Sequence, residues 1–152
     1  QIKMGYESMS FFYKRAEVFF CNVEEAQSIL KTEENDIKKL LKEIKNLGPK
    51  IVSITDGPNG AYTYDGEEML KIQSYPSPKH PYERTGAGDA YSSTFTCALI
   101  LGKTVSEALS WGPINSMSVI QQVGSQKGLL NMAKLKEYLK KAPKEYTPQR
   151  IN

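Results

Sequence analysis

The sequence predicts an α/β layer fold, and three observations support this prediction. Short apolar runs typical of buried strands alternate with amphipathic segments over the first third of the chain. Two short β-type segments around a glycine then resemble a hairpin. Most of the remainder has the pattern of packed helices, and this order of elements favours an α/β layer architecture. With 152 residues, the chain has the size of a single domain that can bury a real core.

Composition excludes several classes of protein. Hydrophobic residues make up 39% of the chain, and the 11 glycines bring the apolar share to about 46%, which is ordinary for a globular domain. The net charge is +3, with both signs alternating along the chain, so we expect no nucleic-acid partner. No apolar run approaches the ~18 residues that cross a membrane, and no signal peptide opens the chain. Cys21 and Cys97 lie far apart in apolar segments, which suits a reducing, cytoplasmic location.

The first elements can be assigned in order. Residues 3–15 have weak helical character, and residues 16–21 (AEVFFC) form an apolar run that predicts a buried strand. Asn22 then suits a helix N-cap, because its side chain can accept a backbone N–H of the first turn. Acidic residues follow where the helix dipole favours them, so we expect a short helix over residues 23–31.

The clearest helix spans residues 36–47. Its apolar residues recur on one face, which comprises Ile37, Leu40, Leu41, Ile44 and Leu47. Asn35 is its expected N-cap. Gly48-Pro49 ends this helix. A second strand, KIVSIT over residues 50–55, runs into a turn or loop at residues 55–60 (TDGPNG).

A hairpin and an extended connection come next. Residues 61–65 and 67–75 flank Gly66 as two candidate strands. Residues 76–84 contain three prolines and predict an extended connection. Residues 85–102 then read as a Gly-rich turn that runs into a helix of small residues.

The last third of the chain is predicted to be helical. Thr104 and Glu107 form a capping box for a helix over residues 105–122. After a loop that contains two glycines, Asn131 caps a final helix that ends near residue 141. Residues 142–152 form a polar tail.

The segment with the strongest chemical content is Thr85-Gly86-Ala87-Gly88-Asp89-Ala90. Two glycines let a ligand approach the backbone closely, and N–H groups at a helix start point in one direction with the positive end of the dipole. Such a turn suits a phosphoryl group. Asp89 beside it can accept a proton from an attacking hydroxyl, and phosphoryl transfer needs little beyond positioning and charge stabilisation. Taken alone, the segment fits a Gly-rich loop with a helix-capping Asp equally well, and its spacing matches neither the Walker nor the dinucleotide pattern.

Four segments together resemble the PfkB family of carbohydrate kinases, which have the ribokinase-like fold. They occur in the family's order and at plausible spacing: Asn22-Val23-Glu24-Glu25 for an N-x-x-E motif, Thr55-Asp56-Gly57-Pro58-Asn59-Gly60 for a T-x-G-x-x-G loop, Glu83 to Tyr91 for the family's DTTGAGDAF signature, and SVIQQVGSQKG at 118–128 for a helix followed by a Gly loop. The resemblance covers roughly residues 16–140.

The resemblance implies a role for each matching residue. Asp89 would be the catalytic base, and Gly86, Ala87 and Gly88 would form the anion hole. Glu25, with Asn22, would organise Mg²⁺ through water, in keeping with the few protein ligands that this ion takes. The residues implied in ATP binding are Thr55, Gly57, Gly60, Thr85, Asn115 and Gly124. The alternatives are simple N-capping for Asn22 and Glu25 and an ordinary turn for residues 55–60.

The chain also departs from the family pattern. Glu83-Arg84 replaces Asp-Thr, Thr94 stands where Gly or Ala is preferred, and Gly112 stands where an adenine-pocket Asn is expected, with Asn115 or Ser116 as substitutes. Some family members bind a monovalent cation such as K⁺ beside the anion hole. Its candidate ligands here are backbone oxygens near Glu83, Thr85, Val119 and Gly124.

The resemblance further implies a doubly wound α/β/α sandwich, of which this chain would be the C-terminal, nucleotide-binding half with part of the central sheet and the hairpin. The family's first half would precede residue 16. A partial sheet exposes an apolar strand edge, so we expect self-association or a partner chain to cover the AEVFF strand.

The implied function is ATP-dependent phosphorylation of a hydroxyl on a sugar or sugar-like substrate. Two alternatives stay open from the sequence. One is a non-catalytic nucleotide-binding or assembly module derived from such a kinase. The other is a nucleoside or vitamin kinase of the same superfamily, which would share the anion hole and differ in substrate residues.

Overall fold

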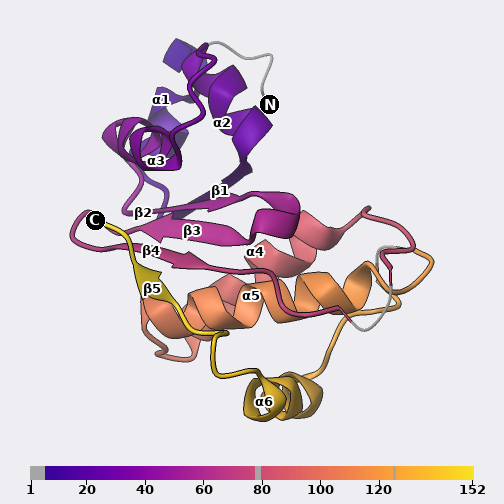
Figure 1. Ribbon diagram of the computed structural model, residues 1–152. Helices are drawn as coiled ribbons and strands as arrows, with labels where there is room; N and C mark the ends of the chain where they lie inside the picture. Colours follow the sequence, from indigo (N-terminus) through magenta and orange to yellow (C-terminus); the bar gives the residue numbers. More distant parts are fainter. Residues whose placement is uncertain (1–5, 78–79, 125) are drawn as a thin grey trace. The chain divides into compact units, whose positions relative to one another are not determined.

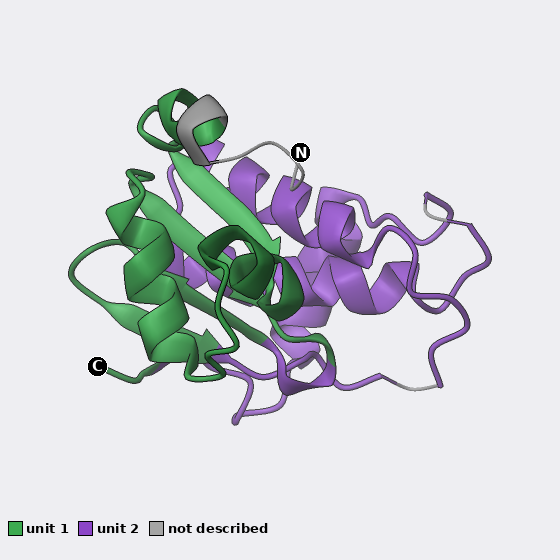
Figure 2. Cartoon of the chain, turned by 90° about the horizontal axis from the view of Figure 1, so that it is seen from above, with its two compact units in different colours: residues 1–57, 61–71, 150–152 green, residues 58–60, 72–149 purple. Residues whose placement is uncertain are grey.

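The structure is a computed structural model that describes residues 6–77, 80–124 and 126–152, and the side chains from residue 9 onward. The chain divides into two compact units (Figure 2). Unit 1 comprises residues 1–57, 61–71 and 150–152, and unit 2 comprises residues 58–60 and 72–149. Helices and a mixed sheet confirm the predicted α/β class.

The elements up to the hairpin follow the predicted order (Figure 1). They are α1 (Tyr6–Tyr13), β1 (Val18–Asn22), α2 (Val23–Leu30), α3 (Ile37–Asn46), β2 (Ile51–Thr55), the 3₁₀ turn η1 (Gly57–Asn59), β3 (Ala61–Tyr64) and β4 (Met69–Ile72). The strands of the hairpin are shorter than the predicted segments: β4 ends at Ile72 rather than at residue 75, and the turn around Gly66 takes more residues. There the Asp65 carboxylate accepts the N–H groups of Glu67 and Glu68, both at 2.8 Å.

The described strands form one sheet in the order β1-β2-β3-β4-β5. Strands β1 and β2 are parallel, with Asn22 opposite Thr55, whereas β2 and β3 are antiparallel. The register therefore brings the carboxyl ends of β1 and β2 to the same edge of the sheet. Strand β1 is the first in this order and has one described neighbour.

The end of the chain, predicted only as a polar tail, contains a strand. Gln149–Arg150 form strand β5, and the Ile151 N–H donates to the Met69 carbonyl at 2.9 Å. Arg150 also forms an ion pair with Glu68 at 3.2 Å. Composition could not reveal this strand, because its partner lies about eighty residues earlier in the chain.

The core of unit 1 forms where the helical periodicity predicted it. Leu40, Leu41 and Ile44 of α3 have no exposed surface and cluster with Val52 and Ile54 of β2. Burying each side chain of this size stabilises the fold by about 1.5–3 kcal/mol relative to exposure. The amphipathic helix is therefore held by packing against the sheet.

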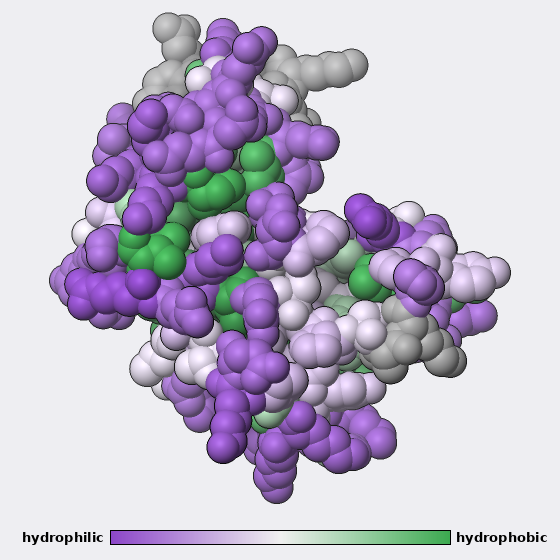
Figure 3. Space-filling view, in the orientation of Figure 1, coloured by the Kyte–Doolittle hydropathy of each residue, from purple (hydrophilic) through white to green (hydrophobic). Residues whose placement is uncertain are grey.

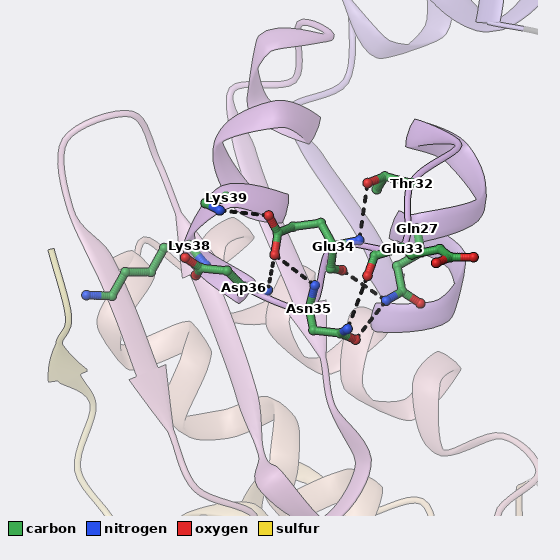
Figure 4. A network of polar contacts seen from close by, with 8 residues as sticks. All are labelled: Gln27, Thr32, Glu33, Glu34, Asn35, Asp36, Lys38 and Lys39. Atoms are coloured by element: carbon green, nitrogen blue, oxygen red, sulfur yellow. Dashed lines mark hydrogen bonds and ion pairs between the residues drawn. The ribbon is translucent and has the colours of Figure 1, made fainter.

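The start of α3 differs from the prediction by one residue. The N-cap is Asp36, whose carboxylate accepts the Lys38 N–H at 2.9 Å. Asn35, the predicted cap, has its side chain turned to other partners: it accepts from Gln27 at 3.1 Å and donates to the Glu33 carbonyl at 3.1 Å (Figure 4). Both residues suit an N-cap, and the contacts of the α2–α3 loop decide between them.

Unit 2 contains α4 (Ala87–Ile100), α5 (Val105–Val119) and α6 (Met132–Lys141). The predicted capping box is present, with the Glu107 N–H bonded to Thr104 Oγ1 at 3.2 Å and the Thr104 N–H to the Glu107 carboxylate at 2.9 Å. Asn131 caps α6 as predicted. Helix α5 ends at Val119, three residues before the predicted end.

Helices α4 and α5 pack closely at Tyr91, which is 2% exposed. A Cβ atom on Gly112 would lie 2.5 Å from two ring atoms of Tyr91. Gly112 therefore leaves the space that this ring occupies.

A tyrosine cluster holds the segment after α6. The Tyr146 hydroxyl donates to the Ser110 carbonyl at 2.7 Å, and its ring meets Tyr75 at 4.9 Å between centroids. Burial raises the pKa of Tyr146 far above its usual range. The segment predicted to be a polar tail thus includes a buried aromatic anchor.

Hydrophilic residues cover most of the face of the molecule seen in Figure 3, with hydrophobic ones in small groups.

Candidate functional site

The Gly-rich turn enters α4 through a conformation that favours glycine. Gly86 is the N-cap of α4 with φ +84° and has no side chain that could cap the helix. Its carbonyl accepts the Ala90 N–H at 2.9 Å, while the Ala87 N–H reaches back to the Arg84 carbonyl at 3.3 Å. The N–H groups of the first helical turn have no acceptors within the helix. Together with the positive end of the dipole, they suit an anionic ligand.

Gly88 lies where the backbone is open on its side-chain side. Apart from the nearby backbone of α4 itself, no described atom lies within 4 Å of a Cβ atom built there. At Gly60, by contrast, such an atom would overlap the Ile72 carbonyl oxygen. Gly60 is therefore required by close packing, whereas packing does not explain Gly88. The open side of Gly88 leaves room for a ligand to reach the backbone.

Asp89 is the third residue of α4 and is exposed. Within the part of the chain that the structure describes, no hydrogen bond or ion pair engages its carboxylate. A carboxylate in the first turn of a helix lies in the region where the dipole favours negative charge. Asp89 is therefore available to accept a proton from a group beside the turn.

Of two adjacent polar side chains of α5, Asn115 and Ser116, the second contacts the turn. Ser116 Oγ donates to the Ala87 carbonyl oxygen at 2.7 Å. Asn115 is 6% exposed, donates to Thr94 Oγ1 at 2.7 Å and accepts the Leu130 N–H at 3.0 Å. Both ends of the Asn115 amide are thus used within the fold, and this geometry gives its predicted part in ATP binding no support.

The segment before the turn is tied to the residues after α5. The Tyr82 N–H donates to the Ile120 carbonyl at 2.7 Å, and the Gly124 N–H donates to a carboxylate oxygen of Glu83 at 3.2 Å. Glu83 and Gly124, both named as neighbours of a candidate cation site, therefore lie together. Thr85 is exposed in the turn between Glu83 and α4.

In unit 1, Asn22 and Glu25 form a complete capping box at the start of α2. The Glu25 N–H donates to Asn22 Oδ1 and the Asn22 N–H donates to Glu25 Oε2, both at 2.8 Å. Thr55 is the register partner of Asn22 on β2. The carboxyl ends of parallel strands are a common place for ligands in α/β folds.

The other loop residue predicted beside ATP is Gly57, in η1. It has φ +48°, and a Cβ atom on it would have no neighbour within 4 Å. A side chain here would be strained by the backbone conformation rather than by crowding.

The donor set for a metal ion is sparse. Among the described residues, no group of three or more His, Cys, Asp or Glu side chains could hold one. Glu25 bonds to the Asn22 N–H through one carboxylate oxygen, Oε2. This arrangement fits an ion that keeps most of its waters, as Mg²⁺ does, and it does not fit a closed protein cage.

Of the helices described, none is long and apolar enough to cross a membrane.

Sequence reasoning missed the link from Ser116 to the turn. The resemblance to the family gives Ser116 only as a substitute in an adenine pocket. The one signal for it was the pair of polar residues, Asn115-Ser116, within an otherwise apolar stretch of helix.

Comparisons with known proteins identify the family of the chain. Residues 8–132 match the model of the pfkB family carbohydrate kinases. The chain is 36% identical over 94 residues to an ATP-dependent 6-phosphofructokinase of Thermoanaerobacterium thermosaccharolyticum, an alignment that covers 62% of this chain and 27% of that protein. It is 30% identical over 111 residues to a cytidine kinase of Thermococcus kodakarensis, covering 72% of this chain and 39% of that protein.

Among solved structures, a putative ribokinase II of E. coli in complex with ATP and Mg²⁺ superposes with a TM-score of 0.77 at 18% identity, covering 89% of this chain and 42% of that one. This likeness shows that the fold is shared. The chain spans between about a quarter and two fifths of the length of these curated relatives.

Proposed function

The chain belongs to the pfkB family of carbohydrate kinases, and on that premise we propose that it serves ATP-dependent phosphoryl transfer to a hydroxyl group of a sugar or sugar-like substrate. The observation that carries this proposal is the first turn of α4. Within four residues it combines a positive-φ N-cap at Gly86, an open backbone at Gly88 and an exposed carboxylate at Asp89. A kinase needs these features to hold a phosphoryl group beside a base.

In the proposed reaction, Asp89 accepts the proton of the attacking hydroxyl. The hydroxyl oxygen then forms a bond to the γ-phosphorus of ATP, while the bond from that phosphorus to the β–γ bridging oxygen breaks. The bond electrons leave with ADP. The N–H groups of Gly86 and Gly88, together with that of Ala87 once it leaves its 3.3 Å bond to the Arg84 carbonyl, stabilise the negative charge on the transferring group.

The remaining predicted residues have supporting roles in this proposal. Asn22 and Glu25 bind waters of Mg²⁺, which supplies charge neutralisation at the phosphates when bound. The ribokinase II neighbour is described with ATP and Mg²⁺. The proposed contacts to the ATP phosphates and ribose come from Thr55, Gly57, Gly60, Thr85 and Gly124. A monovalent cation near Glu83 and a cytoplasmic location belong to the same proposal.

A second candidate is a nucleoside kinase with the same anion hole, and the cytidine kinase relative is the observation that favours it. A screen of sugars and nucleosides as phosphate acceptors separates the two.

A further part of the proposal is that a second copy or a partner chain covers the edge of β1. Sedimentation of this chain at several concentrations tests it.

The binding test is calorimetric titration of the chain with a non-hydrolysable ATP analogue and Mg²⁺. We expect saturable binding that is lost in Gly88→Val, because the valine side chain fills the open side of the turn. Absence of binding to the parent chain would contradict a phosphate site in this chain.

The test of the base is Asp89→Asn. This change keeps the shape of the side chain and removes its capacity to accept a proton, so ATP-analogue affinity should stay within about twofold. The transfer rate should fall by about 10²–10⁴-fold, the usual contribution of a general base. The assay follows ADP release in an assembly that transfers phosphate. An unchanged transfer rate would refute the role of Asp89.

A further inference from the structure

The contact from α5 to the Gly-rich turn joins two residues 29 positions apart. Ser116 Oγ donates to the Ala87 carbonyl oxygen at 2.7 Å, and Ser116 is only partly exposed. In an α-helix, the Ala87 carbonyl also accepts the N–H four residues later, which belongs to Tyr91. The Ala87 carbonyl thus has one bond along α4 and a second, short bond from another helix.

The peptide group transmits this contact to the next residue. The Ala87 carbonyl and the Gly88 N–H belong to one planar trans peptide unit, so they point in opposite directions and turn together. A hydroxyl that holds the carbonyl therefore fixes the direction of the Gly88 N–H. The bond also polarises the peptide, which strengthens the N–H as a donor. Glycine at 88 makes such a restraint useful, because its backbone is the most free to rotate.

Two other serines of α5, Ser110 and Ser118, have different partners. Ser110 donates to the carbonyl of Ser106 in its own helix at 3.0 Å. Ser118 donates to the Gly128 carbonyl at 2.7 Å and closes the loop after α5. Among the hydrogen bonds described for these serines, the one from Ser116 reaches the Gly-rich turn.

We propose that Ser116 is a positioning residue of the anion hole: its hydroxyl fixes the Ala87–Gly88 peptide so that the Gly88 N–H is held toward a bound phosphoryl group. The phosphate part of this inference rests on the proposed function. The restraint on the peptide does not, and it can be measured on the chain without ligand.

The first experiment is NMR of the free chain with four sequences: the parent, Ser116→Ala, Ser116→Thr and the control Ser110→Ala. In Ser116→Ala we expect the Gly88 ¹⁵N and Ala87 carbonyl ¹³C signals to shift and the Tyr91 amide to exchange with solvent about fivefold faster, the effect of one typical hydrogen bond. Ser116→Thr keeps a hydroxyl and should restore the parent values. Ser110→Ala should leave all three signals unchanged.

Two results of this experiment would overturn the inference. One is that Ser116→Ala leaves the Gly88 and Tyr91 signals unchanged. The other is that it accelerates exchange equally along the whole of α4, because Ser116 would then only stabilise the helix pair.

The second experiment measures affinity for the ATP analogue and for adenosine. Ser116→Ala should weaken the ATP analogue about fivefold and leave adenosine unchanged, with recovery in Ser116→Thr. Equal weakening of both ligands would overturn the inference. If the parent chain binds no ATP analogue, the proposed function fails for this chain, and the NMR result alone decides whether Ser116 fixes the peptide.

Discussion

The contrast between the two glycines of the turn gives the most direct test of the structure. Gly88→Ala places a methyl group on a residue with helical backbone, where no described atom outside the nearby backbone of α4 lies within 4 Å. Gly86→Ala places the same group on a residue with φ +84°. The two changes are chemically identical and two positions apart. The structure nevertheless predicts opposite effects on stability.

The magnitudes follow from the backbone conformations. Replacing a glycine by alanine at a compatible position stabilises a fold by about 0.4–1 kcal/mol, because the unfolded chain loses freedom. The left-handed conformation costs an alanine about 1–2 kcal/mol. Gly88→Ala should therefore raise the free energy of unfolding by up to about 1 kcal/mol, and Gly86→Ala should lower it by about 1 kcal/mol. For a chain of this length the two variants should differ in Tm by about 4–8 °C.

The affinity of Gly88→Ala for the ligand should fall although its stability rises. The methyl group of Gly88→Ala occupies the open side of the backbone and hinders a phosphoryl group from reaching the N–H donors. Loss of one hydrogen bond to a charged group corresponds to about 1.5–3 kcal/mol, or about 10- to 150-fold in affinity. Gly88→Ala should thus bind the ATP analogue at least about tenfold more weakly although it is the more stable protein.

Circular dichroism during thermal unfolding measures the first effect, and calorimetric titration with the ATP analogue and Mg²⁺ measures the second. A Gly88→Ala variant that is less stable than the parent by 1 kcal/mol or more would show that the space beside Gly88 is not open. Parent-like affinity in that variant would refute the anion hole itself.

Two further predictions concern the cores of the units. Gly112→Ala should destabilise the chain by about 1–3 kcal/mol in urea unfolding, because its Cβ would meet the buried Tyr91 ring at 2.5 Å; Tyr91→Leu should recover part of this loss, and a change below 0.5 kcal/mol would contradict the packing. Burial, with a smaller effect of Glu25, raises the pKa of the Cys21 thiol from 9.0 to about 12. Because the unfolded thiol loses its proton first, stability should fall by about 1.4 kcal/mol per pH unit between pH 9 and 12. The slope of the free energy of unfolding against pH should be smaller by that amount in Cys21→Ala. Equal slopes in the two proteins would disprove the burial of the thiol.

Local patterns predicted the elements whose causes lie within a few residues of each other. The apolar spacing of Leu40, Leu41 and Ile44 predicted a helix and its buried face, and the structure confirms both. The Thr104–Glu107 capping box and the Asn131 cap are as predicted. In each case the hydrogen bond or the packing face involves residues three or four positions apart, which a sequence displays directly.

Local patterns did not predict which residue takes a role where two neighbouring residues suit it equally well. Asn35 and Asp36 are both good N-caps, and contacts from Gln27 and Glu33 engage Asn35 elsewhere. Asn115 illustrates the same limit. Its amide suits a ligand as well as a core, and the positions of Thr94 and Leu130 direct it to the core.

By itself, the sequence determined the α/β class, the order of the helices and strands up to residue 141, and the family to which the chain belongs. It also identified the Gly-rich turn, because two glycines and an acid at a helix start are a local signature. The tertiary structure alone decided that Ser116 bonds to Ala87, that the segment near residue 150 forms a strand beside β4, and that the open side lies at Gly88 rather than at Gly60. These facts depend on residues far apart in the chain that only folding brings within hydrogen-bond or van der Waals distance.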